Sequence, residues 1–569
     1  MKKTRRFASL ATAAILAACA VVPATMSALP VSAQTVTITQ ATGNAEADHT
    51  YSAYQIFKGT VVDGALTGID WNKDIVNDGA LLTALKGDTQ LGKYFANCTS
   101  AAEVAAALNA KVAGTEEGTE TSVFANNGAL TQHFAELVKA NLKDNVTASA
   151  TSAKNGTSAE LSITADGYYL IVDDTANLQT GAYSRYILTT VDADSDTTLS
   201  IAQKASSPTV VKKVKENTDV DDYTYTDARG SQTDKDYNDV ADYNIGDAVP
   251  FKLYGTMPST IGDYEHYRYI FHDTLGTQFT APAVGNVTVK VDGKNAVGAT
   301  VAIENNEITV TFADIKDGNT ITASSVVTVE YSAVLNKTAQ IGLSGQENAV
   351  KLEYSNDSYW DGSGTPTTSK TPEDKVIVFT YELDVTKQDS VTNKKLKDAE
   401  FNLKNAADKY AKVDENGYVT GWVDTVAEAS VLKSDANGLF KVIGLDDGTY
   451  TLTETKAPTG YNLLNAPVTL KLDATTANGQ NWDVFDATKA LTNLTLTVDT
   501  GAAQPAKTPG EGDSFGKYGV VETTVLNTSG SSLPSTGGIG TTIFYVAGGV
   551  LVVGAGVLLI TKKRAKDAQ

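Results

Sequence analysis

Cysteine, histidine and methionine are scarce in this chain of 569 residues, which holds two cysteines, four histidines and three methionines. Only Cys98 lies outside the N-terminal segment that contains Cys19, so the rest of the chain cannot form an internal disulfide. The histidines show no metal-ligand spacing and no cysteine cluster accompanies them; they are His49, His133, His266 and His272. The sequence therefore predicts no metal site and no cofactor.

Positive charge is also scarce, since the net charge is −21. The positive residues at the two ends are Lys2, Lys3, Arg5 and Arg6, and Lys562, Lys563, Arg564 and Lys566. The first group contributes four positive charges and the tail after Thr536 a net three, so the chain between them carries about −28. A body this acidic argues against binding nucleic acid or anionic lipid.

The N-terminus has the pattern of a secretory signal peptide. An apolar run from Phe7 to Val22 follows the basic residues, and Val31-Ser32-Ala33 is a small-residue cleavage pattern. Residues 1–33 are therefore predicted to be removed on export. Leu16-Ala17-Ala18-Cys19 resembles a lipoprotein processing site and is the alternative. Mass spectrometry of the mature N-terminus separates them, because a start at Gln34 excludes the lipid.

The C-terminus reads as a cell-wall sorting signal. The motif Leu533-Pro534-Ser535-Thr536-Gly537 precedes an uncharged apolar segment, 539–560, and a basic tail, 561–569. About 20 apolar residues suffice to cross a bilayer, and the basic tail holds the cytoplasmic side. The expected location is extracellular, on the cell surface, after cleavage between Thr536 and Gly537.

The body of the chain is predicted to be mainly β. Apolar and polar residues alternate in stretches such as Thr35-Val36-Thr37-Ile38 and Ile308 to Phe312, and turn residues such as Asp292-Gly293 separate them. This pattern, over about 500 residues, predicts three tandem β-sandwich domains. Their expected bounds are 34–205, 206–375 and 376–528.

The first domain is expected to carry helical insertions. The helical stretches are Asp74 to Leu85, Ser100 to Val112 and Leu130 to Leu142. Ser100 and Glu103 form a capping box ahead of an alanine-rich run. Tyr54 to Phe57 and Gly167 to Val172 are expected in the sheet core.

Two lysines occupy strand positions on apolar faces. Lys387 shares its face with Leu383 and Val385, and Lys212 lies between two valines of its own face. Burial favours the neutral amine, which is a nucleophile. The simpler interpretation is that each lysine reaches solvent or pairs with a buried acid.

A carboxyl group shows the same anomaly. Glu454 lies on the face of Tyr450 and Leu452, and Asn527 ends the last strand. If the first and last strands of this domain are neighbours, Lys387 and Asn527 can meet over Glu454. A protonated acid beside a neutral amine can polarise an amide carbonyl for attack.

The segment from Tyr450 to Tyr461 resembles the E-box of the backbone pilins of Gram-positive bacteria, whose pili are assembled by sortases. The matching positions are Tyr450, Leu452, Glu454, Thr455, Ala457, Pro458, Gly460 and Tyr461. The sorting signal matches as well, and the resemblance covers essentially the whole chain. It implies immunoglobulin-like domains, the third of the collagen-adhesin-B type, in which Lys and Asn side chains condense with loss of ammonia. In the third domain it implies a bond between Lys387 and Asn527, promoted by Glu454.

In the second domain the resemblance implies a bond between Lys212 and Asn356, with Asp273 as the acid. The segments similar to the family's middle domain are Tyr243 to Asp247, Phe271 to Thr274 and Leu352 to Asn356. Asn348 shares a strand face with Asn356, and spacing alone cannot choose between them. Asn356 is preferred because, like Asn527, it ends its strand.

The resemblance also implies a lysine that joins subunits. In the family the sorting threonine, here Thr536, is transferred to a lysine at the end of the first domain. Lys204 occupies that place, although Ala202-Gln203 precede it where the family has Tyr-Pro. Lys212 and Lys213 are competitors, but their place in a buried strand argues against them.

These features imply a structural shaft subunit of a covalent pilus that supports adhesion. The implied partners are other copies of the chain, pilus-specific and housekeeping sortases, minor pilins and cell-wall peptidoglycan, with host matrix or glycans left open. The alternative is a monomeric wall-anchored adhesin that binds host matrix or glycan. An enzyme is not expected, because Glu454 and Asp273 lie in different domains and form no paired-carboxylate site.

Overall fold

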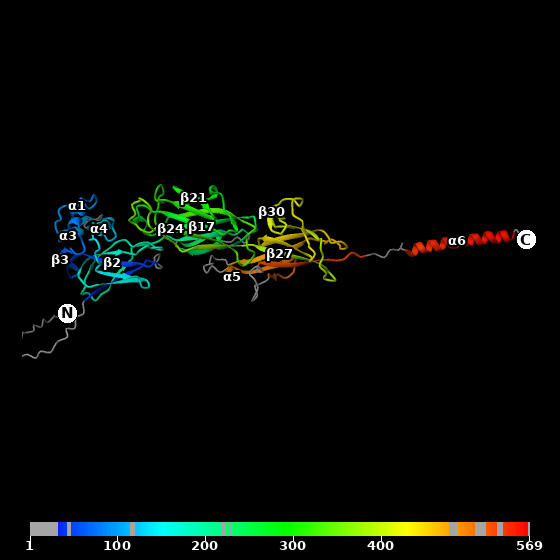
Figure 1. The fold of residues 1–569 in the computed structure, drawn as a ribbon, viewed down its shortest axis with the longest axis horizontal. Helices are drawn as coiled ribbons and strands as arrows, with labels where there is room; N and C mark the ends of the chain where they lie inside the picture. Colours follow the sequence, from blue (N-terminus) through cyan, green and yellow to red (C-terminus); the bar gives the residue numbers. More distant parts are fainter. Residues whose placement is uncertain are drawn as a thin grey trace, which may run out of the picture. The chain divides into compact units, whose positions relative to one another are not determined.

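The computed structural model describes residues 32–41, 47–113, 120–217, 222–227, 229–235, 237–476, 487–506, 519–531 and 539–566. Over these residues the chain is mainly β, as the sequence predicts (Figure 1). It divides into two compact units, Met1–Ser206 and Ser207–Gln569. Most of the signal segment and all of Leu533 to Gly537 lie outside the described residues.

The first unit is a β-sandwich of two sheets with the strand orders β10-β1-β7 and β3-β2-β8-β9, and β6 pairs with β2. The short strands β4 and β5 pair with each other in a separate two-stranded sheet. The strands of the unit are β1 (Gln34–Thr39), β2 (Thr50–Val62), β3 (Ala65–Trp71), β4 (Lys111–Ala113), β5 (Glu120–Ser122), β6 (Ala150–Ala153), β7 (Ser158–Ile163), β8 (Gly167–Asp173), β9 (Ile187–Val191) and β10 (Leu199–Ala202). Alternate residues such as Val36 and Ile38 are fully buried between the sheets.

Four helices cover the outer face of the larger sheet. They are α1 (Asp78–Gly87), α2 (Gly92–Phe95), α3 (Ala101–Leu108) and α4 (Ala129–Ala140), and Figure 1 shows α1, α3 and α4 gathered near β3. Ser100 and Glu103 make the predicted capping box at the start of α3. Phe95 and Phe134 of the helices pack in one core with Phe57 of β2, so the second face of this sheet is buried as well.

The second unit begins with a two-sheet module. One sheet has the order β14-β11-β16-β23-β19-β20 and the other β15-β26-β24-β17-β22-β21. The strands of the first are β11 (Val210–Lys215), β14 (Tyr237–Asn238), β16 (Ala248–Thr256), β18 (Phe279–Thr280), β19 (Thr288–Val291), β20 (Lys294–Asn295) and β23 (Val326–Leu335). The strands of the second are β15 (Val240–Asp242), β17 (Tyr269–Leu275), β21 (Ala299–Glu304), β22 (Glu307–Phe312), β24 (Gln346–Ser355), β25 (Thr368–Lys370) and β26 (Asp374–Phe379). A separate hairpin, β12 (Asp222–Asp227) with β13 (Gly230–Lys235), and the turns η2 (Ile261–Asp263) and η3 (Val284–Asn286) complete the module.

The C-terminal module is a second sandwich, with sheets ordered β32-β27-β37 and β30-β29-β28-β33-β34-β35-β36. Its elements are β27 (Tyr381–Asp389), β28 (Glu400–Lys404), β29 (Tyr410–Val413), β30 (Val419–Val423), β31 (Leu432–Lys433), β32 (Leu439–Leu445), β33 (Gly448–Lys456), β34 (Val468–Thr476), α5 (Ala487–Ala490), β35 (Leu491–Val498), β36 (Gln504–Pro505) and β37 (Val520–Asn527). Its first strand, β27, pairs in parallel with its last strand, β37. The condition set by the sequence for Lys387 and Asn527 to meet is therefore met.

The two modules of the second unit are continuous. The expected boundary at 375/376 falls inside β26, which pairs with β24 of the middle module along its length. The chain then passes through the fully buried Thr380 into β27. Ile377 and Phe379 of β26 pack into the core of the C-terminal module, so no flexible linker separates the two sandwiches.

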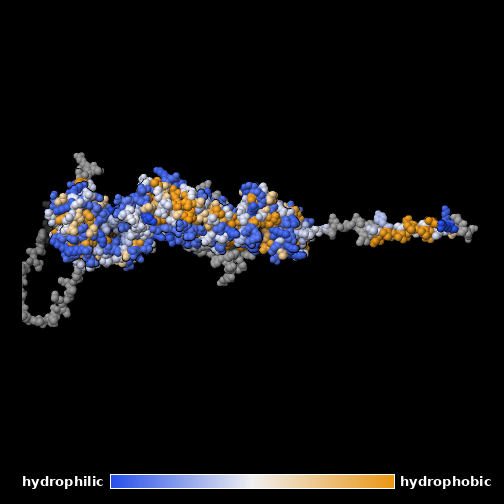
Figure 2. All heavy atoms as spheres, turned by 45° about the horizontal axis from the view of Figure 1, so that its top comes forward, coloured by the Kyte–Doolittle hydropathy of each residue, from blue (hydrophilic) through white to orange (hydrophobic). Residues whose placement is uncertain are grey.

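The last described element is the long helix α6 (Ile539–Lys566). Residues 542–566 are long and apolar enough to cross a membrane, and Figure 2 shows the helix apolar along most of its length with a hydrophilic end. A membrane span of this kind matches the expectation for 539–560 and the basic tail.

Candidate functional sites: buried lysines and a buried acid cluster

Lys387 lies inside the C-terminal module. Every second residue of β27 from Tyr381 to Asp389 is buried, and Lys387 is 0% exposed. Its Nζ lies 3.8 Å from Oε1 of Glu454 and donates to the carbonyl oxygen of Val525 at 3.1 Å. Burial lowers the pKa of Lys387 to about 8, and the nearby Glu454 opposes the shift. A fraction of this amine is therefore uncharged near neutral pH.

Asn527 lies beside Lys387, on the neighbouring strand. The parallel register pairs Lys387 with Val525 and Asp389 with Asn527, so the two side chains are two residues apart on one face. Asn527 is 1% exposed and its Nδ2 donates to Oε2 of Glu454 at 3.1 Å. Glu454 therefore contacts both the amine and the amide.

The loop after β33 holds this arrangement in place. The carbonyl oxygen of Asn462 accepts from Nδ2 of Asn527 at 2.6 Å, and the N–H of Leu464 donates to Oε2 of Glu454 at 2.9 Å. Glu454 Oε1 and Asn527 Oδ1 have no hydrogen-bond partner among the described residues. These two oxygens therefore remain available to interact with each other and with the amine of Lys387.

The remaining matched positions of the E-box segment support Glu454. Tyr450, Leu452 and Glu454 alternate on the buried face of β33, as the sequence predicts. The hydroxyl of Tyr450 donates to the carbonyl oxygen of Asp446 at 2.9 Å, and Thr455 donates to that of Glu400 at 3.1 Å. The turn residues place the loop: Tyr461 N–H donates to Pro458 O after Ala457, and Gly460 adopts a φ of 88° that favours glycine.

A second buried lysine cluster lies in the middle module. Lys212 of β11 is 0% exposed, and its Nζ lies 2.5 Å from Oδ2 of Asp273 and 3.1 Å from the hydroxyl oxygen of Tyr331. Tyr331 donates to Asp273 at 2.8 Å, and Nδ2 of Asn348 donates to the Tyr331 oxygen at 2.9 Å. β11 and β23 belong to one sheet, β17 and β24 to the other, so the cluster spans the sandwich.

The electrostatics of this cluster favour neutral groups. Burial lowers the pKa of Lys212, although Asp273 opposes the shift. Burial also raises the pKa of Asp273 against the pull of the lysine. Both directions favour a neutral amine beside a protonated acid, which is the combination that can polarise an amide carbonyl for attack.

The register of β24 places Asn348 closer to Asp273 than Asn356. Asp273 pairs with Val350 and its neighbour Leu275 with Asn348, so Asn348 is a diagonal neighbour of the acid. Asn356 lies six residues beyond Val350, about 20 Å at the rise of a strand. It is buried there, where its Nδ2 donates to Ser369 at 2.8 Å.

The ion pair of Lys213 and the buried hydroxyl of Tyr331 are two features that the sequence did not reveal. Lys213 is 4% exposed and forms a 2.5 Å ion pair with Asp239. The acid lies 26 residues further along the chain, between β14 and β15. Tyr331 lies on the buried face of β23, where alternation alone predicts only another core residue.

Lys204 lies in the first unit, two residues beyond β10. It is half-buried, and its Nζ contacts Oδ1 of Asn126 at 3.4 Å. Its backbone is held on both sides, because its N–H donates to Ser184 and its carbonyl oxygen accepts from the N–H of Arg185. Burial, together with the charge of Arg185, lowers the pKa of Lys204 to about 8. This terminal amine is therefore a better nucleophile at neutral pH than an ordinary surface lysine.

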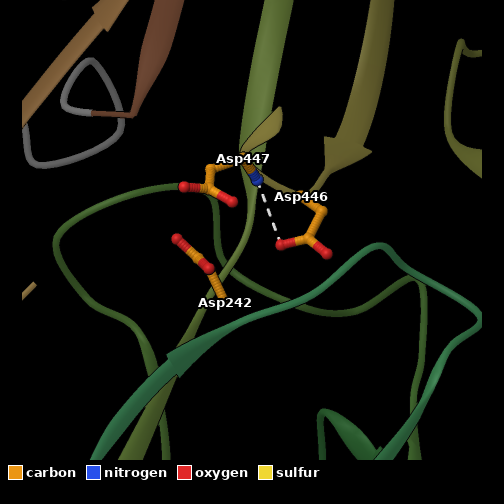
Figure 3. Close-up of side chains that lie close together, drawn as sticks. All are labelled: Asp242, Asp446 and Asp447. Atoms are coloured by element: carbon orange, nitrogen blue, oxygen red, sulfur yellow. Dashed lines mark hydrogen bonds between the residues drawn. The ribbon is translucent and has the colours of Figure 1, made fainter. Parts of the chain in front are cut away.

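Three acidic residues meet where the two modules of the second unit join. Figure 3 shows the carboxyl groups of Asp242, Asp446 and Asp447 converging, and their oxygens lie within 4.8 Å of one another. Tyr381 donates to Asp242 at 2.7 Å, and Asn217 donates to Asp446 at 3.0 Å. Carboxylate oxygens are the ligands that hard cations prefer, so this is the group among the described residues that could hold one. The spacing of residues along the sequence could not reveal this cluster, because Asp242 lies on β15 and the other two aspartates lie in the turn after β32, far along the chain.

Burial raises the pKa of both Asp242 and Asp446, and the neighbouring carboxyl groups add to it. The folded chain therefore holds protons that the unfolded chain has lost above about pH 4. The free energy of unfolding is therefore expected to fall as pH rises from that point through the raised pKa values of the two carboxyl groups in the folded chain.

Asp446→Asn should flatten this fall in the free energy of unfolding and increase stability near neutral pH, because an amide can donate a hydrogen bond to Asp242. Calorimetry across the pH range in chelator-containing buffer measures both effects. The exposed Asp473→Asn is the control, and an unchanged slope in Asp446→Asn would contradict the interpretation.

Two family profiles match parts of the chain. Residues 381–483 match the SpaA family, a prealbumin-like fold domain, and residues 526–567 match the LPXTG cell wall anchor motif. The chain is 24% identical over 372 residues to the trypsin-resistant surface T6 protein of Streptococcus pyogenes serotype M6. That alignment covers 56% of this chain and 65% of the relative.

The chain resembles the sortase-assembled backbone pilins of Gram-positive bacteria. Among solved structures, the T6 backbone pilin of the same serotype aligns with 88% of this chain and 99% of its own, at 16% identity and a TM-score of 0.48. The full-length major pilin SpaD of Corynebacterium diphtheriae aligns with 88% and 98%, at 15% identity and a TM-score of 0.44. The anchor profile and the surface relative confirm the predicted extracellular, cell-wall-anchored location.

Proposed function

We propose that this chain is the structural shaft subunit of a covalently polymerised surface pilus and supports adhesion in that form. The observation that carries the proposal is the convergence of Lys387, Glu454 and Asn527 on the first, an inner and the last strand of one module. The anchor profile over residues 526–567 supports the role of a sortase substrate. The chain is not an enzyme in this proposal, because each buried lysine reacts once.

The bond in the C-terminal module forms by amide exchange. The neutral Nζ of Lys387 attacks Cγ of Asn527, while the carboxyl group of Glu454 polarises the Oδ1 of Asn527, which accepts no other hydrogen bond among the described residues. A new C–N bond forms, the bond from Cγ to Nδ2 breaks, and Glu454 passes a proton from the amine to the departing ammonia. The product is an isopeptide bond between neighbouring parallel strands, closing a loop of about 140 residues.

In the middle module we place the bond between Lys212 and Asn348, with Asp273 as the acid. Tyr331 supports this choice because its hydroxyl contacts the amine, the acid and the amide. Here the acid and the amide share one sheet and the lysine reaches them from the other. The bond would therefore tie the two sheets of the sandwich together.

Replacing the two asparagines separately tests this choice. Asn348→Ala is expected to raise the intact mass by that of one ammonia molecule, after correction for the substitution, because the amide carbon is gone. Asn356→Ala should leave the ammonia loss unchanged, which makes it the matched control. Intact mass spectrometry of the purified chain measures both. The reverse pattern would restore Asn356 as the partner.

Subunits are joined through Thr536 and Lys204 in this proposal. A sortase cleaves between Thr536 and Gly537, holds Thr536 as a thioester, and Nζ of Lys204 attacks it and releases the enzyme thiol. The lowered pKa of Lys204 and its place beyond the last strand of the first unit support its role. The implied partners are further copies of the chain, the pilus-specific and housekeeping sortases, minor pilins and peptidoglycan.

A monomeric wall-anchored adhesin is the second candidate, since it would share the anchor and the internal bonds. Peptide mass spectrometry of the surface-extracted protein separates the two. A branched peptide that joins Thr536 to a lysine of another copy is expected for a shaft subunit. Extraction of a single-chain species attached only to peptidoglycan would instead support the adhesin.

A further inference from the structure

A cavity of about 540 Å³ opens in the middle module, beside the start of β17. Its lining comes from residues 265–268, 313–317 and 360–366, all within the second unit. The volume lies in the range that small ligands occupy. Neither the internal bonds nor the proposed polymer joint uses any of these residues.

Arg268 faces this cavity. It lies just before β17, between Tyr267 and Tyr269, which are fully buried in the core, and its own side chain lines the cavity. The Nε of Arg268 is buried and has no hydrogen-bond acceptor among the described residues. A buried guanidinium N–H that lacks an acceptor is costly, and a carboxylate satisfies it best because its two oxygens match the planar fork.

The other inner charges of the lining are already engaged. Asp314 accepts from Nδ1 of His266 at 2.7 Å and from the N–H groups of Tyr267 and Lys316, each at 3.0 Å. These hydrogen bonds lower the pKa of Asp314 even though burial opposes the shift. The Nζ of Lys316 donates to the carbonyl oxygens of Ile261 and Tyr264. Arg268 is therefore the cation of the lining that remains for a ligand.

Trp360 supplies a flat apolar wall. Its indole is half-buried, its Nε1 donates to the carbonyl oxygen of Ser363 at 2.8 Å, and its ring centroid lies 5.9 Å from that of His266. Gly362 has a φ of 81°, and a Cβ there would lie 2.7 Å from Cδ2 of His266. The close approach of this loop holds the indole at the cavity.

Two exposed acidic residues at the rim of the cavity limit how much negative charge a ligand can carry. Glu265 and Asp317 line the cavity and are exposed, so their carboxylates can accept hydrogen bonds from hydroxyl groups but repel further anions. The net negative charge of the chain acts weakly at this range, because salt screens charges beyond about 8 Å. The lining thus suits one carboxylate, several hydroxyl groups and one apolar face.

We propose that this cavity binds a carboxylate-bearing sugar, such as a uronic or sialic acid at the end of a glycan. The sugar carboxylate binds Arg268, its C–H face packs on Trp360, and its hydroxyl groups donate to Glu265 and Asp317. A peptide with several acidic residues fits less well, because the rim repels the second negative charge. This goes beyond the shaft role and does not depend on polymerisation.

Calorimetric titration of the full, unpolymerised chain in detergent tests the proposal. The probes are glucuronic acid, N-acetylneuraminic acid, neutral glucose and a short polyaspartate peptide. At least one of the acidic sugars should bind at least about tenfold more tightly than glucose and the peptide, since a charge-assisted hydrogen bond is worth that much. Equal affinity for glucose and both acidic sugars, or tighter binding of the peptide, would overturn it.

Variants assign the site. Arg268→Gln should weaken binding of the acidic sugar about tenfold. Arg268→Lys keeps the charge but loses the planar fork, so its affinity should lie between those of the parent and Arg268→Gln. Trp360→Ala should weaken it as well. Lys337→Gln removes an exposed positive charge of the same module outside the cavity and should bind as the parent does. If Arg268→Gln fails to fold, as judged by its unfolding temperature, Arg268→Lys and Trp360→Ala decide, and parental affinity in both would refute the site.

Discussion

Glu454→Gln is expected to abolish the bond between Lys387 and Asn527. Glutamine keeps the shape of the side chain but cannot pass a proton between the amine and the amide. After correction for the substitution, intact mass spectrometry should show the chain heavier by one ammonia molecule than a chain with both bonds. The free energy of unfolding of the module should fall by about 5 kcal/mol, because a loop of about 140 residues is no longer closed in the unfolded state.

The exposed Glu415→Gln of the same module is the matched control for mass and stability. Chemical denaturation gives the free energy, and the peptide that carries Lys387 identifies the bond directly. A Glu454→Gln chain with the parental mass would show that the acid is not needed. A parental chain that already has its unmodified mass would show that neither bond forms.

Lys204→Arg should abolish the high-mass ladders that a polymer gives on denaturing gels. Arginine keeps the positive charge beside Asn126, but its guanidinium stays protonated and cannot attack the thioester of Thr536. The expected product is a single-chain species linked to the wall or left in the membrane. The effect is all or none, because each subunit offers one such amine in the proposed joint.

Lys86→Arg, an exposed lysine of the first unit, is the control and should give parental ladders. The thermal unfolding of both variants should match the parent, since neither lysine lies in a core. Ladders that persist in Lys204→Arg would move the joint to another lysine. Lys212 and Lys213 would then remain poor candidates, because both are buried and in contact with acids.

Alternation along strands predicted the burial of Lys212, Lys387 and Glu454, because the period of two is a local property of the chain. The same reasoning could not separate Asn348 from Asn356, since both fall on one face. The choice depends on the cross-strand register that places Val350 opposite Asp273. Register is a tertiary property that spacing along one strand does not encode.

Two other features depended on tertiary structure in the same way. Asp242 and Asp446 meet through the parallel pairing of β15 with β26 and the passage of the chain into the next sandwich. The expected domain boundary at 375/376 falls inside β26, because spacing along the chain does not show which modules a strand packs against. Residues 374–379 form this strand, since their apolar side chains are buried against both modules.

Because β27 pairs in parallel with β37, the proposed bond can form only in a chain that has folded correctly. A slip of β37 by one residue would turn Asn527 to the opposite face, away from Lys387 and Glu454. Only chains whose last strand has docked in the native register can then react, and the reaction cannot be reversed by later unfolding. The mass of a single molecule would therefore report whether that molecule has ever been native, even after it has been denatured for the measurement.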